Sequence, residues 1–255
     1  MPTYVHLIRH AQGFHNLSAA NHQLHDPDLT PLGKSQCAEL CKIFPHHDKI
    51  THLVASPMRR TLYTCLLSFE PAVKAGKTVT ALPELQEVSS LPCDTGSPSE
   101  KLAAEFDSTQ ADFSLLRPDW TDKSRSSPWA PEMGKLEERA KKARVWLRTL
   151  GSQVKDREDA HIIAVTHGGF LHFLTQDWDG MNPEKGTGWE NAEYRSYEFV
   201  DATGQDPNAS LKETKISWRG RRGSAKGLTE TEQRELRSVL KERLEEEFGE
   251  KKDAK

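Results

Sequence analysis

Residues suited to holding and attacking a phosphate group stand just beyond two apolar stretches of the chain. Arg9 and His10 follow the run 5–8, and His167 lies just beyond the run 161–165. An Arg guanidinium presents paired N–H donors that fit phosphate oxygens. A neutral His nitrogen is a competent nucleophile near pH 7, because its ordinary pKa is about 6.5. These residue types point to phosphoryl transfer without a metal ion.

A sheet and two helix starts are needed to bring these residues together. The apolar runs predict buried strands, and the alternation of strands with helices predicts a three-layer α/β fold: a mostly parallel central sheet with helices on both faces. Ligands of such sheets bind beyond the carboxyl ends of the strands, so His10 and His167 should lie close together. A helix beginning at Gly168 would direct its free N–H groups there. A second helix, beginning near residue 56, would add Arg60.

Hydrophobic periodicity predicts the remaining elements. The further strands are 51–55, 79–82, 194–200 and 211–218, the last two forming a hairpin. Thr30 and Pro31 are suited to open a helix as its N-cap and first position. The other predicted helices are 57–69, 98–106, 136–150 and one from about 229 to 248.

The alkoxide that leaves a phosphate ester needs a proton, which a carboxylic acid with a raised pKa can supply. Glu84 and Glu87 stand just past the predicted strand 79–82, where either could act as this acid. If Glu84 is not the acid, we expect it to be a turn residue that faces solvent.

Five ordered segments resemble the signature of the histidine phosphatase superfamily, whose fold is that of phosphoglycerate mutase. The segments are Arg9–Gln12 with Asn16, Asp28–Gly33 with Gln36, Ser56–Arg60 with Thr64, Leu85–Glu87, and Thr166–Phe170. The resemblance covers roughly residues 3 to 200. Within this superfamily the chain resembles a short, phosphatase-type branch and is similar to fungal phosphoglycerate-mutase-like proteins.

The resemblance implies a role for each candidate residue. His10 would accept the phosphoryl group, and Glu87 would be the general acid, with Glu84 as the alternative because it also follows a leucine at a fitting distance. Counted from Ser56, the family's arginine is Arg60 and not Arg59. The phosphate would be held by Arg9, Asn16, Arg60, His167 and Gly168.

Three functions fit this pattern. The first is a phosphatase that hydrolyses a phosphomonoester through a phosphohistidine. The second is a cofactor-dependent phosphoglycerate mutase, which is disfavoured because Gly13-Phe14-His15 lacks the hydroxyl that true mutases carry there. The third is a non-catalytic protein that binds a phosphorylated ligand, which is disfavoured because nucleophile and acid occur together.

The composition indicates which classes of partner and which cellular location to expect. The net charge of −3 gives no support to nucleic-acid binding. The mean hydropathy is −0.71, and no run approaches the about 18 apolar residues of a membrane span. The start of the chain does not read as a signal peptide, and the four cysteines suggest neither disulfides nor a zinc site. We expect a cytoplasmic protein that uses no cofactor or metal and takes a small phosphorylated substrate.

The chain is predicted to divide into a phosphatase domain, residues 1–219, and a linker with a charged C-terminal helix, residues 220–255. Within the domain, the segment 89–134 is expected to cap the site and, with the rim loop 14–27, to set specificity. A mobile insertion is the alternative, although Trp120 and Trp129 argue for order. The apolar seam of the C-terminal helix suits packing on its own domain or pairing two copies of the chain. The histidines outside the signature are expected at the surface or rim; they are His15, His22, His25, His46 and His47.

Overall fold

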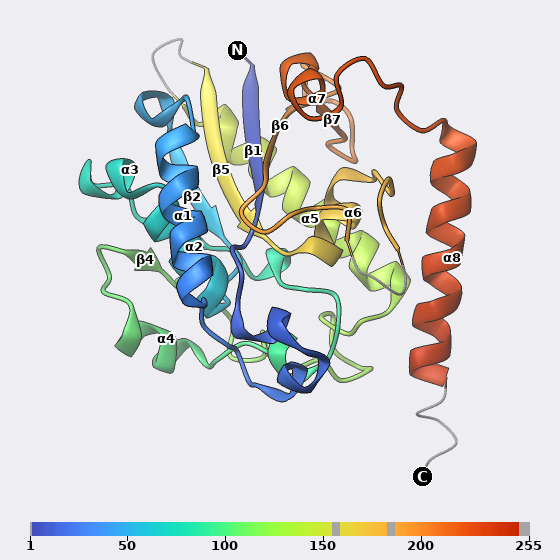
Figure 1. The fold of residues 1–255 in the computed structure, drawn as a ribbon, viewed down its shortest axis with the longest axis horizontal. Coiled ribbons are helices and arrows are strands. Elements are labelled where there is room, and N and C mark those ends of the chain that lie inside the picture. The colour runs from blue at the N-terminus through green and yellow to red at the C-terminus, as the bar shows by residue number, and fades with distance from the viewer. Residues whose placement is uncertain (1, 155–158, 183–186, 250–255) are drawn as a thin grey trace.

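The computed structural model describes residues 2–154, 159–182 and 187–249, and within them a seven-stranded sheet forms the centre of the molecule (Figure 1). Its strands are β1 (Thr3–Arg9), β2 (His52–Ala55), β3 (Val79–Ala81), β4 (Ala111–Asp112), β5 (Ala160–Thr166), β6 (Tyr194–Phe199) and β7 (Leu211–Glu213). They lie in the order β4-β3-β2-β5-β1-β6-β7. The pairings from β4 to β1 are parallel, and β6 and β7 add antiparallel pairings at one edge.

Helices cover both faces of the sheet. They are α1 (Pro31–Ile43), α2 (Arg59–Ser68), α3 (Glu70–Lys74), α4 (Ser99–Glu105), α5 (Met133–Ser152), α6 (Gly168–Thr175), α7 (Lys215–Arg222) and α8 (Glu230–Gly249). Short 3-10 turns occur at η1 (Phe14–Leu17), η2 (Ala19–Gln23), η3 (His47–Lys49), η4 (Pro83–Leu85) and η5 (Pro92–Asp94). Figure 1 shows α1 and α2 on one side of β1 and β5, and α5 and α6 on the other.

The strand β5 explains the layering, because its side chains alternate between two cores. Ile162 and Ala164 pack with residues of α5 and α6, whereas Ile163 and Val165 pack with residues of α1 and α2. Such a strand, apolar on both faces, is what a central parallel strand requires. The predicted three-layer α/β fold is confirmed.

The first predicted helix start is confirmed in detail. Pro31 is the first residue of α1, and the Thr30 side chain accepts a hydrogen bond from the Gly33 N–H. The predicted strand 211–218 is wrong beyond Glu213. There the Thr214 side chain accepts a hydrogen bond from the Ser217 N–H and begins α7, which runs on through the expected domain boundary at 219.

Several side chains of the cap segment 89–134 are buried in the folded core. Trp120 and Trp129 are buried in the cluster shared with α1 and α2, and β4 adds a strand to the sheet. This packing favours a folded cap over the mobile-insertion alternative. All four cysteines are free thiols.

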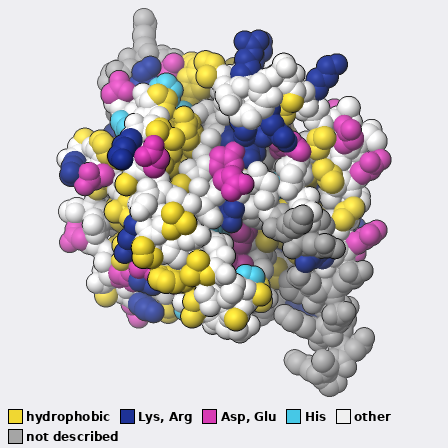
Figure 2. All heavy atoms as spheres, in the orientation of Figure 1, with side chains coloured by type: hydrophobic (Ala, Val, Ile, Leu, Met, Phe, Trp, Pro, Cys, Tyr) yellow, Lys and Arg dark blue, Asp and Glu magenta, His cyan; other side chains and the backbone are white. Residues whose placement is uncertain are grey.

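The C-terminal helix α8 packs on its own domain. Leu240 and Leu244 join the core cluster of α5 and α6, and Thr229 and Glu232 form a capping box at its start. The seam residue Phe248 lies outside the side chains that the structure describes. No helix among the described residues is long and apolar enough to cross a membrane. On the face drawn in Figure 2, Lys and Arg side chains are interspersed with Asp and Glu, and no large basic patch forms.

Candidate active site

The register of β1 and β5 places the two signature histidines side by side. Arg9 pairs with Thr166, so the next residues along both strands, His10 and His167, leave the sheet at the same edge. The His10 N–H donates to the Thr166 carbonyl at 2.9 Å, and the two imidazole centroids are 5.2 Å apart. The expected proximity of the histidines is confirmed.

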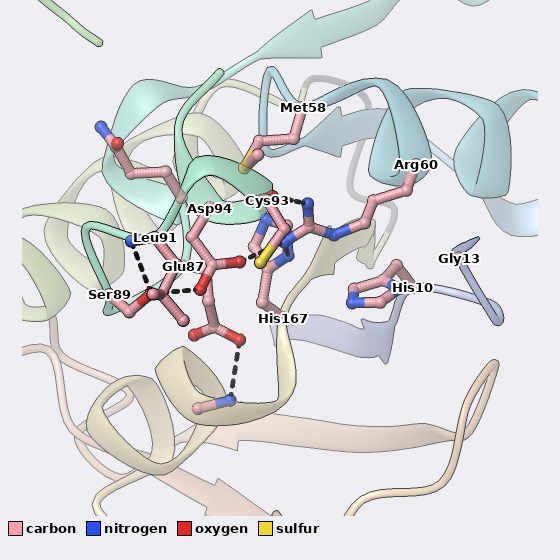
Figure 3. A network of polar contacts seen from close by, with 12 residues as sticks. His10, Gly13, Met58, Arg60, Glu87, Ser89, Leu91, Cys93, Asp94 and His167 are labelled. Carbon is pink, nitrogen blue, oxygen red and sulfur yellow. Dashed lines mark hydrogen bonds and ion pairs between the residues drawn. The ribbon is translucent and has the colours of Figure 1, made fainter. Parts of the chain in front are cut away.

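The first turn of α2 brings Arg60, and not Arg59, to the histidines. The Arg60 side chain is fully buried, and its Nη2 is 3.0 Å from His167 Nδ1 and 2.9 Å from Asp94 Oδ1 (Figure 3). Its Nη1 donates to the Cys93 carbonyl. Arg59 instead pairs with Glu105. Because Asp94 fixes one side of the guanidinium, Arg60 is held in place before any anion arrives.

The imidazole of His10 is held in the protonation state that a nucleophile needs. Its Nδ1 lies 2.8 Å from the Ala11 carbonyl oxygen, which can only accept, so Nδ1 carries the proton and the lone pair is on Nε2. Burial, with the nearby charges of Arg60 and Arg9, lowers the pKa of His10 well below its ordinary value. The ring is therefore neutral near pH 7.

His167 is neutral and oriented by two partners. Its Nδ1 accepts from the Arg60 guanidinium, so its Nε2 carries the proton and donates to Ser56 Oγ at 2.9 Å. Burial and the charge of Arg60 lower its pKa well below the ordinary value. The ring thus connects the end of β5 to the start of α2 and lies beside His10.

Glu87 sits at the start of α6. Its carboxylate accepts hydrogen bonds from the N–H groups of Val88 at 2.9 Å, Gly169 at 3.2 Å and Phe170 at 2.9 Å. A Cβ on Gly169 would lie 2.7 Å from Glu87 Oε1, so a larger residue there would displace the carboxylate from this position. Burial raises the pKa of Glu87, and the charge of Asp94 raises it further.

The alternative acid, Glu84, faces elsewhere. It lines a cavity of about 520 Å³ together with Trp129, Arg139 and Trp146. The charges that act on Glu87, by contrast, include Asp94 and Arg60. Glu87 is therefore the carboxylate that shares the site with the histidines.

The remaining predicted residues differ in how directly they join the site. Arg9 donates from Nη1 to the Trp189 carbonyl, while its Nε is buried without a partner among the described residues. A Cβ on Gly168 would lie 3.2 Å from that Nε, so Arg9 passes close to the start of α6. Asn16 is exposed, and its side-chain oxygen accepts from the Gly13 N–H. In this structure Asn16 caps a turn at the rim.

For His15 the prediction of a surface or rim position is wrong, because the ring is buried beside His10. The residue is 7% exposed, and its ring centroid is 5.2 Å from that of His10. Burial and the charges of Arg60 and Arg9 lower its pKa to about 2. The turn that buries it is closed by a bridge between Gly13 and Leu29, a contact that no spacing in the sequence signals.

Asp94 and Lys123 were not anticipated at all. Both come from the cap segment: Asp94 accepts from Arg60 and from Ser89 Oγ, and Lys123 Nζ donates to the Glu87 carbonyl at 3.1 Å. In the sequence nothing distinguishes these two from the other charged residues of the segment 89–134.

Known proteins resemble this chain in sequence and in fold. The model of the histidine phosphatase superfamily (branch 1) matches residues 5–212. The chain is 26% identical over 242 residues to a phosphoglycerate mutase-like protein of Arabidopsis thaliana, which covers 77% of this chain and 84% of the relative.

Solved structures share the fold at low identity. The ecdysone phosphate phosphatase from Bombix mori, in complex with tungstate, has a TM-score of 0.57 at 13% identity and covers 90% of this chain and 98% of its own. The mycobacterial glucosyl-3-phosphoglycerate phosphatase has a TM-score of 0.51 at 17% identity and covers 84% and 97%. These likenesses support the α/β fold.

Proposed function

Because the chain belongs to branch 1 of the histidine phosphatase superfamily, we propose that it hydrolyses a phosphomonoester through a phosphohistidine on His10. The observation that carries the proposal is the state of this ring. Its Nδ1 proton is bound to the Ala11 carbonyl, which leaves the Nε2 lone pair to attack, beside Arg60 and His167. A pure binding site has no need of a neutral, oriented nucleophile.

In the first step, Nε2 of His10 attacks phosphorus, and the bond from phosphorus to the ester oxygen breaks. Arg9, Arg60 and His167 stabilise the charge on the remaining phosphate oxygens, while the N–H groups at the start of α6 add their positive dipole end. Glu87 in its acid form transfers a proton to the leaving oxygen. The raised pKa of Glu87 supports this role, because it increases the protonated fraction.

In the second step, water attacks the phosphorus of the phosphohistidine. Glu87, now a carboxylate, takes a proton from this water, and the bond between phosphorus and Nε2 breaks. Inorganic phosphate leaves, while His10 and Glu87 return to their starting states. A mutase would share the first step but return the phosphoryl group to a bound intermediate.

The test is a screen of the purified protein against phosphorylated metabolites, with a chelator present and phosphate release as the readout. We expect hydrolysis that His10→Ala abolishes and that His52→Ala, a change at the amino end of β2, leaves intact. Full activity of His10→Ala would overturn the proposal. Interconversion of 3-phosphoglycerate with a bisphosphoglycerate primer, without net hydrolysis, would identify a mutase. Phosphate binding without turnover of any compound would identify a binding protein.

A further inference from the structure

A cavity of about 520 Å³ lies between the cap segment, the turn that precedes Glu87, and α5. Its volume is in the range of sites that bind small molecules. The residues that line it include none of those assigned to the catalytic steps, so it is separate from the candidate active site. Its walls are largely apolar and are formed by Leu82, Pro83, Leu115, Pro128, Trp129 and Trp146.

Arg139 of α5 lines this cavity and has N–H donors that are not used. Its side chain is 3% exposed, and its Nη2 donates to the carbonyl oxygens of Gln86 at 2.8 Å and Glu87 at 3.2 Å. Its Nε and Nη1 are buried without a hydrogen-bond partner in the described part of the chain. Buried donors that stay unpaired destabilise a protein, so these groups call for an acceptor.

A second lining residue lacks the same kind of partner. The Trp129 side chain is 8% exposed, and among the described residues its Nε1 also has no hydrogen-bond partner. The indole and the guanidinium can donate but not accept hydrogen bonds. The missing partner is therefore an acceptor, and because the walls are apolar, the rest of that molecule should be apolar too.

Arg139 also differs from the other cations that line the cavity in having no carboxylate partner. Among the described residues it bonds only to backbone carbonyls, while Glu84 and Glu87 act on it as nearby charges. With these two carboxylates close by, a monoanion suits the guanidinium better than a dianion. The other lining cations are already in ion pairs: Arg117 with Asp119, Lys135 with Glu132, and Lys142 with Glu138.

We propose that this cavity is an effector site for a small apolar carboxylate, whose negative end is held by Arg139 and Trp129. The binding site stands on the cavity and its unpaired donors. The effect on catalysis rests in addition on the proposed phosphatase function, because it acts through the general acid.

Arg139 connects the cavity with that acid. The negative charge of Glu87 acts on the guanidinium, so the guanidinium in turn favours the carboxylate form of Glu87. A bound anion offsets the charge of Arg139 and raises the pKa of Glu87. The other charges that act on this region belong to Asp94, Arg60 and Lys123, and they stay in place. Occupancy of the cavity should therefore keep Glu87 in its acid form up to a higher pH.

The test measures binding of 2-naphthoate and of the uncharged 2-naphthalenemethanol by isothermal titration calorimetry. Phosphate buffer is used so that phosphate competes for the anion site of the catalytic cluster. The proteins are wild type, Arg139→Met, Trp129→Phe and Lys142→Met. Trp129→Phe keeps an aromatic ring but loses the N–H donor. Lys142 is an exposed cation that lines the same cavity, so its variant is the matched control.

We expect 2-naphthoate to bind the wild-type protein more tightly than the alcohol does. Arg139→Met should raise the Kd of 2-naphthoate by about 10-fold to 100-fold, and Trp129→Phe by about 2-fold to 10-fold, as the loss of a charged and of a neutral hydrogen bond predicts. Lys142→Met should stay within about threefold of wild type. An unchanged Kd for the alcohol in Arg139→Met shows that the cavity is still folded.

The effect on catalysis is read from the pH profile of kcat on an alkyl phosphate that the protein hydrolyses. Saturating 2-naphthoate should move the descending limb to higher pH in the wild-type protein but not in Arg139→Met. The alcohol should leave the limb in place.

Three results would overturn the proposal. If neither probe binds, or both bind equally well, the unpaired donors bond to water and not to an anion. Undiminished binding of 2-naphthoate to Arg139→Met would place the anion elsewhere. Binding that leaves the descending limb unmoved would remove the effector role. A protein that hydrolyses no phosphate ester would overturn the phosphatase function instead, while the titrations would still decide whether the cavity binds a carboxylate.

Discussion

Two histidine clusters form along β1 and β5, and they differ in their neighbours: His6 and His161 lie within the strands, and His10 and His167 lie just beyond their carboxyl ends. Toward the amino ends, His6 Nε2 is 3.0 Å from His161 Nδ1, and the His46 ring packs against both. Toward the carboxyl ends, His10 and His167 lie beside the buried guanidinium of Arg60.

The difference lies in what surrounds the rings. The His6 ring packs on Phe44 and shares a hydrogen bond between its Nδ1 and the hydroxyl of Ser196. Among the described residues, no guanidinium contacts the His6 ring. The cluster of His10 also has the start of α6 beside it, with N–H groups directed at the site. Adjacent histidines thus serve packing in one place and form an anion site in the other, according to the donors around them.

The largest expected effect concerns the general acid at the second cluster. Glu87→Gln should lower kcat on an alkyl phosphate by about 10²-fold to 10⁴-fold, because the leaving alkoxide loses its proton donor. The loss on 4-nitrophenyl phosphate should be much smaller, since nitrophenolate leaves without a proton. Steady-state kinetics on both esters make the check, with Glu84→Gln as the control expected to match wild type. Equal losses in the two variants would contradict the assignment.

The next effect separates the two adjacent arginines. Arg60→Lys keeps the charge but loses the planar pair of donors, so kcat/KM should fall by about 10²-fold. Arg59→Lys, which changes the partner of Glu105, should stay within about threefold of wild type. Urea unfolding of both variants controls for stability. A larger loss in Arg59→Lys would show that the wrong arginine was assigned.

A third prediction concerns the pH dependence of the first step. Glu87 must be protonated to act as the acid, and its pKa is raised, so activity on an alkyl phosphate should fall as pH rises through that raised pKa. His10 must be neutral to attack, so activity should also fall at low pH, where His10 becomes protonated. Because the pKa of His10 is lowered, this fall should occur at a lower pH than for an ordinary histidine. The pH profile of kcat should lose its descending limb in Glu87→Gln. A limb that persists in this variant belongs to another group.

The smallest effect concerns the cluster that is not expected to act in catalysis. Burial and the neighbouring His161 and His46 lower the pKa of His6 to about 3. Between about pH 6.5 and pH 3, His6 binds a proton in the unfolded chain but stays neutral in the folded protein. The free energy of unfolding therefore falls as pH falls through this range. His6→Gln should reduce this slope by at most about 1.4 kcal/mol per pH unit, measured by urea unfolding, and leave kcat/KM unchanged. An unchanged slope would show that His6 does not contribute to it.

The part of the site that follows from short stretches of sequence could be predicted. Arg9, His10 and His167 stand at the ends of apolar strands, and parallel strands bring such ends to one edge. The same reasoning placed Arg60 on a helix start. The roles of these residues remain proposals, but their proximity is a property of the fold.

The part that depends on long-range packing could not be predicted. Asp94 and Lys123 reach the site only because the cap folds onto it through Trp120, and His15 is buried only because its turn pairs with Leu29. Ile216 and Trp218 alternated with polar residues like a strand, yet the side chain of Thr214 starts a helix there. The hydrophobic pattern of a short stretch does not show whether a neighbouring side chain will begin a helix or which distant residues will pack against it.

One measurement tests the central claim directly: whether the phosphoryl group passes through His10. The wild-type protein is mixed with a radiolabelled phosphate ester that it hydrolyses, quenched within milliseconds in alkali, and mapped by proteolysis. We predict an alkali-stable, acid-labile label on the peptide that contains His10, retained in His6→Gln and lost in His10→Ala. Hydrolysis that proceeds with no labelled protein, or with an acid-stable label on another residue, would contradict the account.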